Sequence, residues 1–244
     1  MYQLSIIIPT LNEEACLRQT LKHLQKLSPQ AYEIIVADGG STDGTKTIAS
    51  AFPVKFVEAN RTGRASQMNA GAAHATGDYL CFLHADTTAP PDLVNIIGDT
   101  LGDTRISLGG FVSVMGSPGN IRYFTTGLNY CKTLLGPLLY SPYRCLFQGL
   151  RLLFGDQAIF CRRRDFLQVG GYDKETPIME EAYLCEKMHR LGRIRQIGRR
   201  VYTSDRRITH LGFWKAHIIY LSIFFLWVAG MSPGKLHHFY KNIR

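Results

Sequence analysis

The feature that most constrains the fold is a repeated alternation between short apolar runs and helical segments. Four apolar runs, at residues 4–8, 33–37, 54–57 and 79–83, each have the length of one buried strand. Segments with helical spacing of apolar residues separate them, the last being an alanine-rich stretch over residues 64–75. This alternation predicts right-handed crossovers and an α/β fold, with a mostly parallel sheet flanked by helices.

The pattern is looser after residue 90. Residues 91–101 and 179–191 are predicted to be helices, and residues 108–114 and 157–161 are predicted to be strands. The segment 121–154 is rich in Leu, Tyr and Phe but matches no pattern with a clear mechanism.

The fourth apolar run leads directly to a carboxylate, Asp86. In an open α/β sheet, ligands collect where the carboxyl ends of the strands meet. Just upstream, Arg64 and Asn69 lie at the start of a predicted helix, whose N-terminal N–H groups attract phosphate oxygens. A lone acid with basic and amide groups nearby suits a divalent cation that holds a diphosphate, as in an enzyme acting on an activated nucleotide.

A second acid, Asp38, ends the second apolar run in front of two glycines. Asp in this position is often only a turn former. Together with Thr10, Asn12 and Glu13 at the neighbouring strand end, it is expected to bind a nucleobase edge and ribose hydroxyls. The spacing of Thr10 and Glu13 also predicts a capping box at the start of the first helix.

Two common nucleotide fingerprints are missing. The first strand is followed by PTLNEE rather than by GxGxxG, which argues against a dinucleotide site. The segment 39–46 is a near miss to the phosphate-binding P-loop, because Thr45 separates Gly44 from Lys46. Hydride transfer and P-loop chemistry are therefore disfavoured.

The composition is that of a globular protein with anionic partners. The 244 residues carry a net charge of +9, which favours nucleotides, nucleic acid or an anionic membrane surface. The six cysteines are scattered without metal-ligand spacing and suggest a reducing compartment. Since the N-terminus lacks a basic region and a long apolar stretch, we expect a cytoplasmic location.

The strongest apolar run is residues 218–229, with the sequence IIYLSIFFLWVA. It is shorter than the roughly 20 residues that a helix needs to span a bilayer. A helix packed on the domain and an interfacial helix at the inner face of a cell membrane both remain open.

Six segments together resemble the GT-A fold glycosyltransferases of family 2, and some are similar to a small subgroup called radical-SAM/selenodomain-associated transferases. They are SIIIPTLNEE (5–14), VADGGSTDGT (36–45), GRASQMNAG (63–71), FLHADT (82–87), GDQAIF (155–160) and PIMEE (177–181). The resemblance implies a Rossmann-like transferase domain over residues 1–212, with a nucleotide-binding half to about 101 and an acceptor half after it. Residues 213–244 would then form apolar and basic helices on the domain or at a membrane.

The resemblance and the strand-end pattern together give a set of donor-binding candidates: Pro9, Thr10, Asn12, Glu13, Asp38, Ser41, Gly63, Arg64, Asn69, Ala85, Asp86, Arg206 and Arg207. The resemblance places His84-Ala85-Asp86 at the family's Asp-x-Asp position, with Asp86 as ligand to Mn²⁺ or Mg²⁺. His84 and His210 are weaker metal candidates, because these cations prefer oxygen ligands.

The family's general base comes from a Glu-Asp pair at the start of a late helix, where this chain has Glu180-Glu181. The resemblance thus implies Glu181 as base, with Glu180 in reserve and Asp156 orienting a substrate. The leading hypothesis is an inverting, metal-dependent transfer from a nucleotide-sugar based on uridine to an unknown acceptor hydroxyl. The Gln-x-x-Arg-Trp signature of processive synthases is missing, which favours single transfers.

The acceptor remains open between a lipid-linked compound and a small molecule, and no nucleic acid is expected. A nucleotidyltransferase and a non-catalytic nucleotide- or RNA-binding module are the alternatives.

Overall fold

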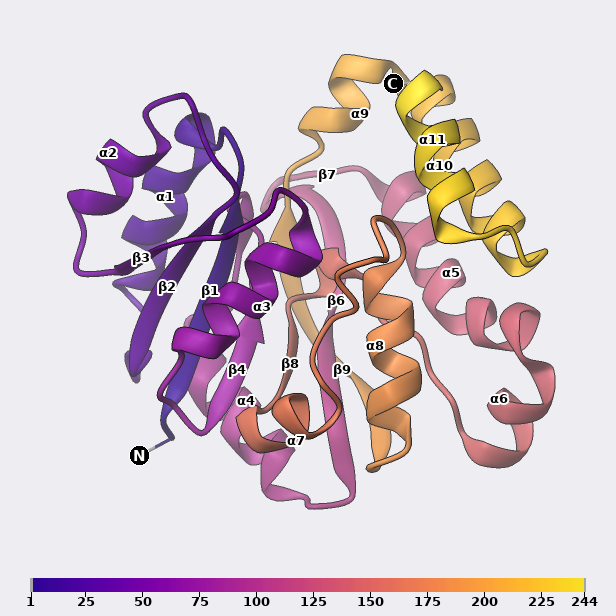
Figure 1. Ribbon diagram of the computed structural model, residues 1–244, viewed down its shortest axis with the longest axis horizontal. Helices are drawn as coiled ribbons and strands as arrows, with labels where there is room; N and C mark the ends of the chain where they lie inside the picture. The colour runs from indigo at the N-terminus through magenta and orange to yellow at the C-terminus, as the bar shows by residue number, and fades with distance from the viewer. Residues whose placement is uncertain (1, 244) are drawn as a thin grey trace.

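The computed structural model describes the backbone of residues 2–243 and the side chains of all of these except Arg207, His210 and residues 241–243. Within that range the strands form one nine-stranded sheet of order β3-β2-β1-β4-β8-β6-β9-β5, with β7 paired to β6 (Figure 1). The strands are β1 (Leu4–Thr10), β2 (Glu33–Asp38), β3 (Lys55–Glu58), β4 (Tyr79–Phe82), β5 (Thr87–Thr88), β6 (Ile106–Ser117), β7 (Asn120–Ile121), β8 (Ile159–Arg162) and β9 (Arg193–Thr203).

Helices cover both faces of this sheet. In chain order they are α1 (Glu14–Leu24), α2 (Thr45–Ser50), α3 (Arg64–His74), α4 (Leu93–Gly102), α5 (Tyr123–Tyr140), α6 (Pro142–Gln148), the short 3₁₀ turn η1 (Gly155–Gln157), α7 (Arg163–Gln168), α8 (Glu180–His189), α9 (Arg206–Leu211), α10 (Phe213–Val228) and α11 (Pro233–Ile243).

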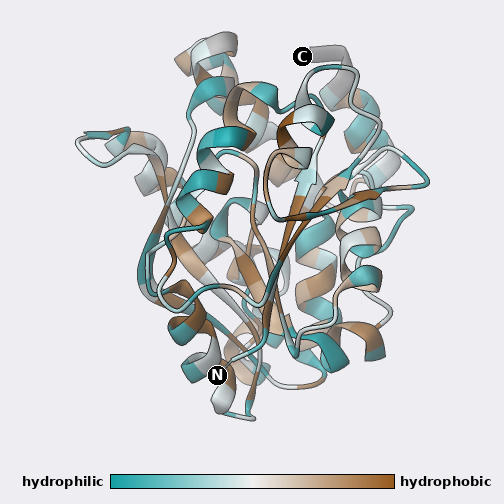
Figure 2. Ribbon diagram, turned by 90° about the vertical axis from the view of Figure 1, so that its left-hand side faces the viewer, coloured by the Kyte–Doolittle hydropathy of each residue, from teal (hydrophilic) through white to brown (hydrophobic). Residues whose placement is uncertain are grey.

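The first four strands confirm the predicted parallel arrangement. β1 pairs in parallel with β2 and with β4, and its register sets Thr10 opposite Asp38. Successive residues of β1 enter different cores: Ile7 packs on the side of α3, and Ile6 and Ile8 pack on the side of α1 and α4. Burial on both faces explains the continuous apolar run, and the hydrophobic colour follows the central strands in Figure 2.

The second half of the chain joins the same sheet in mixed order. β8 lies between β4 and β6 and is antiparallel to both, whereas β6 and β9 are parallel. The strands predicted at 108–114 and 157–161 are therefore present, within somewhat different bounds. β9 was not predicted, because only four of its eleven residues are buried, at irregular spacing, and four others are arginine.

The segment that matched no pattern folds into α5 and α6, and α10 packs against α5. The rings of Tyr140 and Trp227 stack with centroids 4.1 Å apart, and Thr125 contacts His217 Nε2 at 3.0 Å. All but the last residue of the segment 218–229 thus belong to α10, a helix that packs on the domain. No helix in the part of the chain that the structure describes combines the length and apolar character needed to cross a membrane.

The predicted capping box is wrong. Thr10 is the last residue of β1, and its hydroxyl donates to Asp38 rather than to a helix N–H group. α1 begins at Glu14, its N-cap residue Glu13 makes no side-chain capping bond, and the Glu13 carboxylate instead pairs with Arg206. The strand register with β2 takes precedence over the local helix signal.

Candidate active site

The carboxylate of Asp38 is fixed at the carboxyl end of β2. Oδ1 accepts hydrogen bonds from the hydroxyls of Thr10 (2.9 Å) and Ser41 (2.5 Å), and Oδ2 accepts from the backbone N–H groups of Gly40 and Ser41. Asp38 is buried, and charge-assisted bonds of this kind hold a carboxylate in one orientation. Thr10 and Ser41, both predicted donor-binding residues, thus contact Asp38 directly.

Gln67 of α3, which was not predicted, lies next to the group formed by Asp38 and Thr10, which we call the first corner of the site. Its buried side-chain amide donates to the carbonyl oxygen of Thr10. A Cβ atom on Gly39 would lie 2.7 Å from Gln67 Nε2, so the first glycine after Asp38 leaves room for this amide. Gln67 lies within the segment 63–71 that carried part of the resemblance, but its position in an alanine-rich helix gave no further signal.

Asn12 joins the two loops that follow β1 and β2. Its backbone N–H donates to Ser41 Oγ (2.9 Å), and its Oδ1 accepts from the N–H of Thr42 (2.9 Å). Pro9 lies beside Ala37 within the parallel ladder. Asn12 therefore shapes the loops around Asp38, in addition to any contact with a ligand.

A second corner forms around Asp86, which follows β4. Arg206, at the start of α9, donates to Glu13 Oε2 (2.7 Å) and contacts Cys16 Sγ (3.4 Å). The hydrogen bond to Glu13 is the main reason that the pKa of Arg206 is raised, and the charge of Asp86 contributes in the same direction. Glu13, Arg206 and Asp86, which are far apart in the sequence, thus form one electrostatic group.

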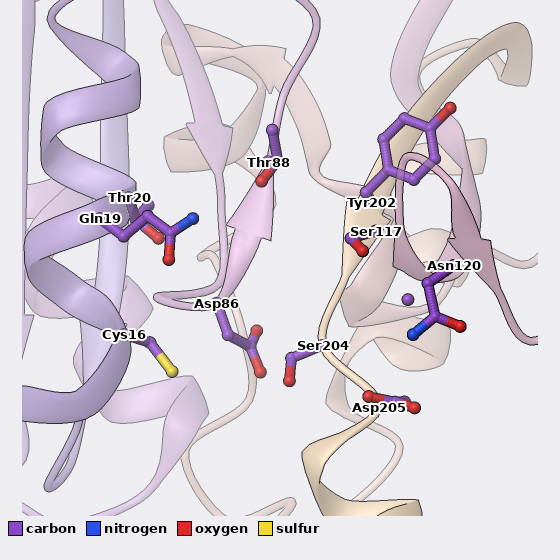
Figure 3. Close-up of a pocket in the computed structure, with 11 residues that line it drawn as sticks. Cys16, Gln19, Thr20, Asp86, Thr88, Ser117, Asn120, Tyr202, Ser204 and Asp205 are labelled. Carbon is purple, nitrogen blue, oxygen red and sulfur yellow. The ribbon is translucent and has the colours of Figure 1, made fainter.

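Asp86 lines a pocket of about 240 Å³. Figure 3 shows it between α1, which carries Cys16, and the segment with Ser204 and Asp205. The preceding Ala85 is buried, and its carbonyl oxygen accepts from the hydroxyl of Thr20 (2.6 Å), which fixes the loop to α1.

The residues of this pocket fit a cation that shares its coordination shell with a ligand. Among residues 2–243 with described side chains, no three His, Cys, Asp or Glu residues cluster as a complete metal site. Asp86, Asp205 and Ser204 provide oxygen atoms, the donors that Mg²⁺ and Mn²⁺ accept, and phosphate oxygens and water would supply the remainder. The predictions for His210 and Arg207 concern side chains outside the described part of the chain.

A third corner lies at the start of α8, where Glu180 and Glu181 are both buried. Arg64, at the start of α3, reaches both carboxylates, with Nη1 at 3.6 Å from Glu180 and 3.7 Å from Glu181. Burial raises the pKa of Glu181 to about 8, and the charge of Glu180 acts in the same direction while Arg64 opposes both. Burial alone would lower the pKa of Arg64, but the two glutamates outweigh it and the pKa is raised.

Gly155 connects this corner to the end of β4. A Cβ atom there would collide with Glu181 Oε1 and would lie 3.0 Å from His84 Nε2. His84 therefore faces Gly155 and the region of Glu181. Asp156, the residue after Gly155, accepts a hydrogen bond from Asn129 Nδ2 of α5 at 3.1 Å.

Two residues that the sequence did not reveal complete the surroundings of Glu181. Lys132 of α5 lies with Nζ 4.0 Å from the centroid of the Phe154 ring; burial lowers its pKa, against the charges of Asp156 and Glu181. Tyr172 is buried, and burial together with the charge of Glu181 raises its pKa well above the usual value. Within the described structure, Tyr172 Oη and Glu181 Oε1 lack hydrogen-bond partners, which is costly unless a ligand or water supplies them.

Asn69 and Gly63 lie on the element that carries Arg64. The side chain of Asn69 forms a pair of hydrogen bonds with the backbone of Tyr172, 2.7 Å and 2.9 Å long. This use of both its polar atoms indicates that Asn69 holds α3 against the Tyr172 segment. Gly63 precedes α3 with φ of 125°, a conformation that favours glycine.

The described non-glycine residues with positive φ all lie next to these corners. They are Asn12 after β1, Ala158 after η1 and Met179 directly before Glu180. Such backbone conformations cost roughly 1–2 kcal/mol each for a residue with a Cβ atom. Strain concentrated at one end of the sheet is typical of a functional site.

Comparisons with known proteins show the family and the fold of the chain. Residues 5–167 match the family model described as Glycosyl transferase family 2. The probable glycosyltransferase YdaM of Bacillus subtilis is 30% identical over 78% of the chain and 47% of its own length. The succinoglycan biosynthesis protein ExoA of Rhizobium meliloti is 29% identical over 97% of the chain and 70% of its own length. The chain spans about half the length of the first curated relatives it matches, at 45% and 47%.

Among solved structures, the fold is similar to that of glucosyl-3-phosphoglycerate synthase from Mycobacterium tuberculosis, in complex with Mn²⁺, UDP and glucosyl-3-phosphoglycerate. The TM-score is 0.62 at 23% identity, and the match covers 94% of this chain and 81% of the other. This likeness establishes the GT-A-like architecture, a mixed sheet flanked by helices.

Proposed function

Because the chain belongs to glycosyl transferase family 2, we propose that it transfers a sugar from a nucleotide-sugar, a uridine one, to an acceptor hydroxyl with inversion at the anomeric carbon. The observation that carries this proposal is the convergence of the Asp86 corner and the buried Glu181 at one end of the sheet, linked through His84 and Gly155. A leaving diphosphate and a proton-accepting carboxylate are the two requirements of such a transfer.

Asp38 and Thr10 receive the nucleoside in this proposal. The Asp38 carboxylate accepts hydrogen bonds from the Thr10 hydroxyl and from the Gly40 N–H group, so both side chains are ordered before the ligand arrives. Glu13 and Arg206 lie beside Asp86, where Arg206 supplies positive charge to the diphosphate. Arg207 and Gly63 remain donor-binding candidates in the adjoining segments.

A divalent cation, Mn²⁺ or Mg²⁺, would be held by Asp86 and would offset the charge that develops on the diphosphate. Support comes from the oxygen-rich pocket around Asp86 and from the related fold that contains Mn²⁺ and UDP. His84 is better placed to interact with Glu181, the proposed base, than to bind the cation, because its Nε2 faces Gly155 and the Glu181 side.

Glu181 acts as the base. Its carboxylate accepts the proton of the acceptor hydroxyl as that oxygen forms a bond to the anomeric carbon and the bond to the diphosphate breaks. Glu180 holds Arg64 in place with Glu181, and Asp156, positioned by Asn129, orients the incoming hydroxyl group.

The acceptor remains an unnamed alcohol, either lipid-linked or small. Location in the cytoplasm and contact with the inner face of a membrane belong to the same proposal, as does the division into a transferase domain over residues 1–212 and helices over 213–244. We propose single rather than processive transfer, and assignment to the radical-SAM/selenodomain subgroup rests on the motifs alone.

The test is donor turnover with and without Mn²⁺ in a panel of nucleotide-sugars. We expect release of nucleoside diphosphate that needs the cation and is lost in Asp86→Ala. In Glu181→Gln, donor binding measured by calorimetry should survive while transfer collapses. Formation of nucleoside triphosphate and sugar 1-phosphate when pyrophosphate is added to the nucleotide-sugar would instead indicate a nucleotidyltransferase, and binding without any turnover would indicate a non-catalytic module.

A further inference from the structure

The longest helix, α5, exposes an apolar face to solvent. Over eighteen residues it contains one charged side chain, Lys132, which is half-buried against Phe154. Its buried positions include Thr125, Thr133 and Gly136. Its exposed positions recur at helical spacing and carry Tyr123, Phe124, Tyr130, Leu134, Leu135, Leu138 and Leu139. The side of α5 that packs on the domain carries small and polar residues, and the side exposed to solvent carries apolar ones. This is the reverse of the usual arrangement in a surface helix.

Two neighbouring helices carry exposed apolar side chains of the same kind. α6, which follows α5 directly, exposes Tyr143, Leu146 and Phe147, the last 75% exposed. α10, which packs against α5, exposes Trp214, Ile218, Leu221 and Phe225 at helical spacing. In Figure 1 these helices gather on one side of the molecule, away from β1, β2 and β3. We call the exposed side chains of α5, α6 and α10 the apolar face.

The charges of the chain are distributed unevenly with respect to this face. Residues 118–155 and 206–244, which form α5, α6 and α9 to α11, contain ten lysines and arginines and no acidic residue. The remainder of the chain carries eighteen basic and nineteen acidic residues. The net charge of +9 thus arises entirely in the segments that form and flank the apolar face.

We propose that the apolar face docks the protein on a lipid bilayer that contains anionic lipid. Aromatic and leucine side chains would enter the boundary between headgroups and acyl chains, and the basic residues around them would meet the anionic headgroups. Arg122 and Arg144 are paired with Asp205 and Glu186, but the segments around the face keep a net positive charge. Two copies of the chain that met through this face would bring two such regions together. A bilayer is therefore the occupant that suits both the apolar and the charged character of the surface.

The docked helices also form one wall of the candidate active site. α5 contributes Lys132, and Asn129 of the same helix positions Asp156. Tyr240 of α11 adds a smaller contribution than Glu180 and Glu181 to the raised pKa of Arg64. An acceptor held in the bilayer would thus approach Glu181 from the membrane side. The docking itself does not depend on the proposed transfer reaction.

The test is flotation with vesicles of phosphatidylcholine alone and of phosphatidylcholine with about 30% phosphatidylglycerol, since anionic lipid should attract the basic segments. We expect binding to the anionic vesicles that weakens at high salt. The double variant Leu134→Ser/Phe147→Ser should lower the bound fraction at least tenfold. The matched control Tyr32→Ser/Leu167→Ser removes two comparably exposed apolar side chains from other parts of the surface and should bind like the parent.

Sedimentation velocity at several protein concentrations completes the test. A monomer that binds anionic vesicles supports the proposal. Failure of the parent to float with either vesicle, an equal loss in both double variants, or a dimer dissolved by Leu134→Ser/Phe147→Ser would overturn it. Glu181→Gln should bind vesicles like the parent, so that loss of docking and loss of transfer are measured separately.

Discussion

The side chain of Glu181 is held in surroundings that favour its protonated form. Burial and the nearby charge of Glu180 raise its pKa to about 8, and Arg64 offsets only part of this effect. A base with a pKa near the working pH combines a useful deprotonated fraction with a strong tendency to accept a proton. The same burial that makes the carboxylate costly to ionise therefore suits it to catalysis.

The rate of transfer should rise with pH and level off above the pKa of Glu181. Since only the deprotonated carboxylate accepts a proton, kcat/KM should increase about tenfold per pH unit below about 8. Initial rates between mildly acidic and alkaline pH measure this directly. Glu181→Gln should lower kcat by about 10²- to 10⁴-fold at every pH. Glu180→Gln is the matched variant, and a larger loss there than in Glu181→Gln would move the base to Glu180.

Lys132 should tune that profile. Its positive charge favours the ionised forms of Asp156 and Glu181, so its removal should make Glu181 harder to deprotonate. We expect Lys132→Gln to shift the rise of kcat/KM toward higher pH, whereas Lys132→Arg, which keeps the charge, should leave the midpoint nearly unchanged. Identical pH midpoints for the glutamine variant and the parent would show that Lys132 does not act on Glu181.

At the residue scale, the sequence revealed the acids better than their partners. Asp38 and Asp86 stood at the ends of apolar runs, and Glu181 stood at the start of a helix, so position alone singled them out. Gln67, Lys132 and Tyr172 lie within or after helices and reach the site only through tertiary packing. No local pattern distinguishes such residues from ordinary surface or core positions.

Among the secondary-structure elements, η1 and α8 approach each other closely at Gly155. Gly155 in η1 has no room for a Cβ atom, because Glu181 Oε1 and His84 Nε2 occupy that space. The position of the proposed base thus depends on a glycine in another element. Met179, the residue before α8, has a strained backbone conformation with φ of 63°. It thereby sets the point at which the helix that carries Glu181 begins.

Gly155→Ala should displace the Glu181 carboxylate and lower transfer about 10²-fold, the usual effect of a shift near 1 Å in a reacting group. Donor binding at Asp38 should be unaffected, because that corner lies on other elements. Parallel kinetics and calorimetry separate the two effects. Gly102→Ala is the control, since a Cβ atom there meets nothing within 4 Å. Unchanged kcat in Gly155→Ala would mean that Glu181 relocates without loss of function.

The elements themselves were predictable to different degrees. Strands β1, β2 and β4 are largely buried on both faces, so each left an apolar run in the sequence. β3 lies at the edge of the sheet with only Val57 buried, and its run is interrupted by Lys55. β9 presents arginines to solvent and contains no continuous apolar run, so the sequence pattern did not predict it. α5 exposes its apolar side, so the usual relation between apolar spacing and burial does not hold there.

For the molecule as a whole, nucleotide and cation should add to global stability. A ligand present at about 100 times its Kd stabilises the folded state by about 2.7 kcal/mol. For a domain of this size, that corresponds to a rise in Tm of roughly 5–10 °C. UDP with Mn²⁺ should give this shift in differential scanning fluorimetry, whereas UDP alone should give less.

Asp86→Ala should abolish the additional shift from Mn²⁺ and retain the parent's Tm without ligands. The half-buried position of Asp86 makes a large loss of intrinsic stability unexpected. An equal Mn²⁺ effect in the variant would place the cation elsewhere.

The antiparallel strand β8 has a consequence for how substrates enter and leave. Its ladders join β4 on one side and β6 on the other, so backbone hydrogen bonds continue across the sheet from strands of the first half of the chain to strands of the second. A hinge motion that separated these two groups of strands would have to break the backbone hydrogen bonds that β8 makes with β4 or β6. Substrates would therefore enter and leave through smaller movements of the loops and the C-terminal helices. The rate of those movements would then limit the rate of turnover.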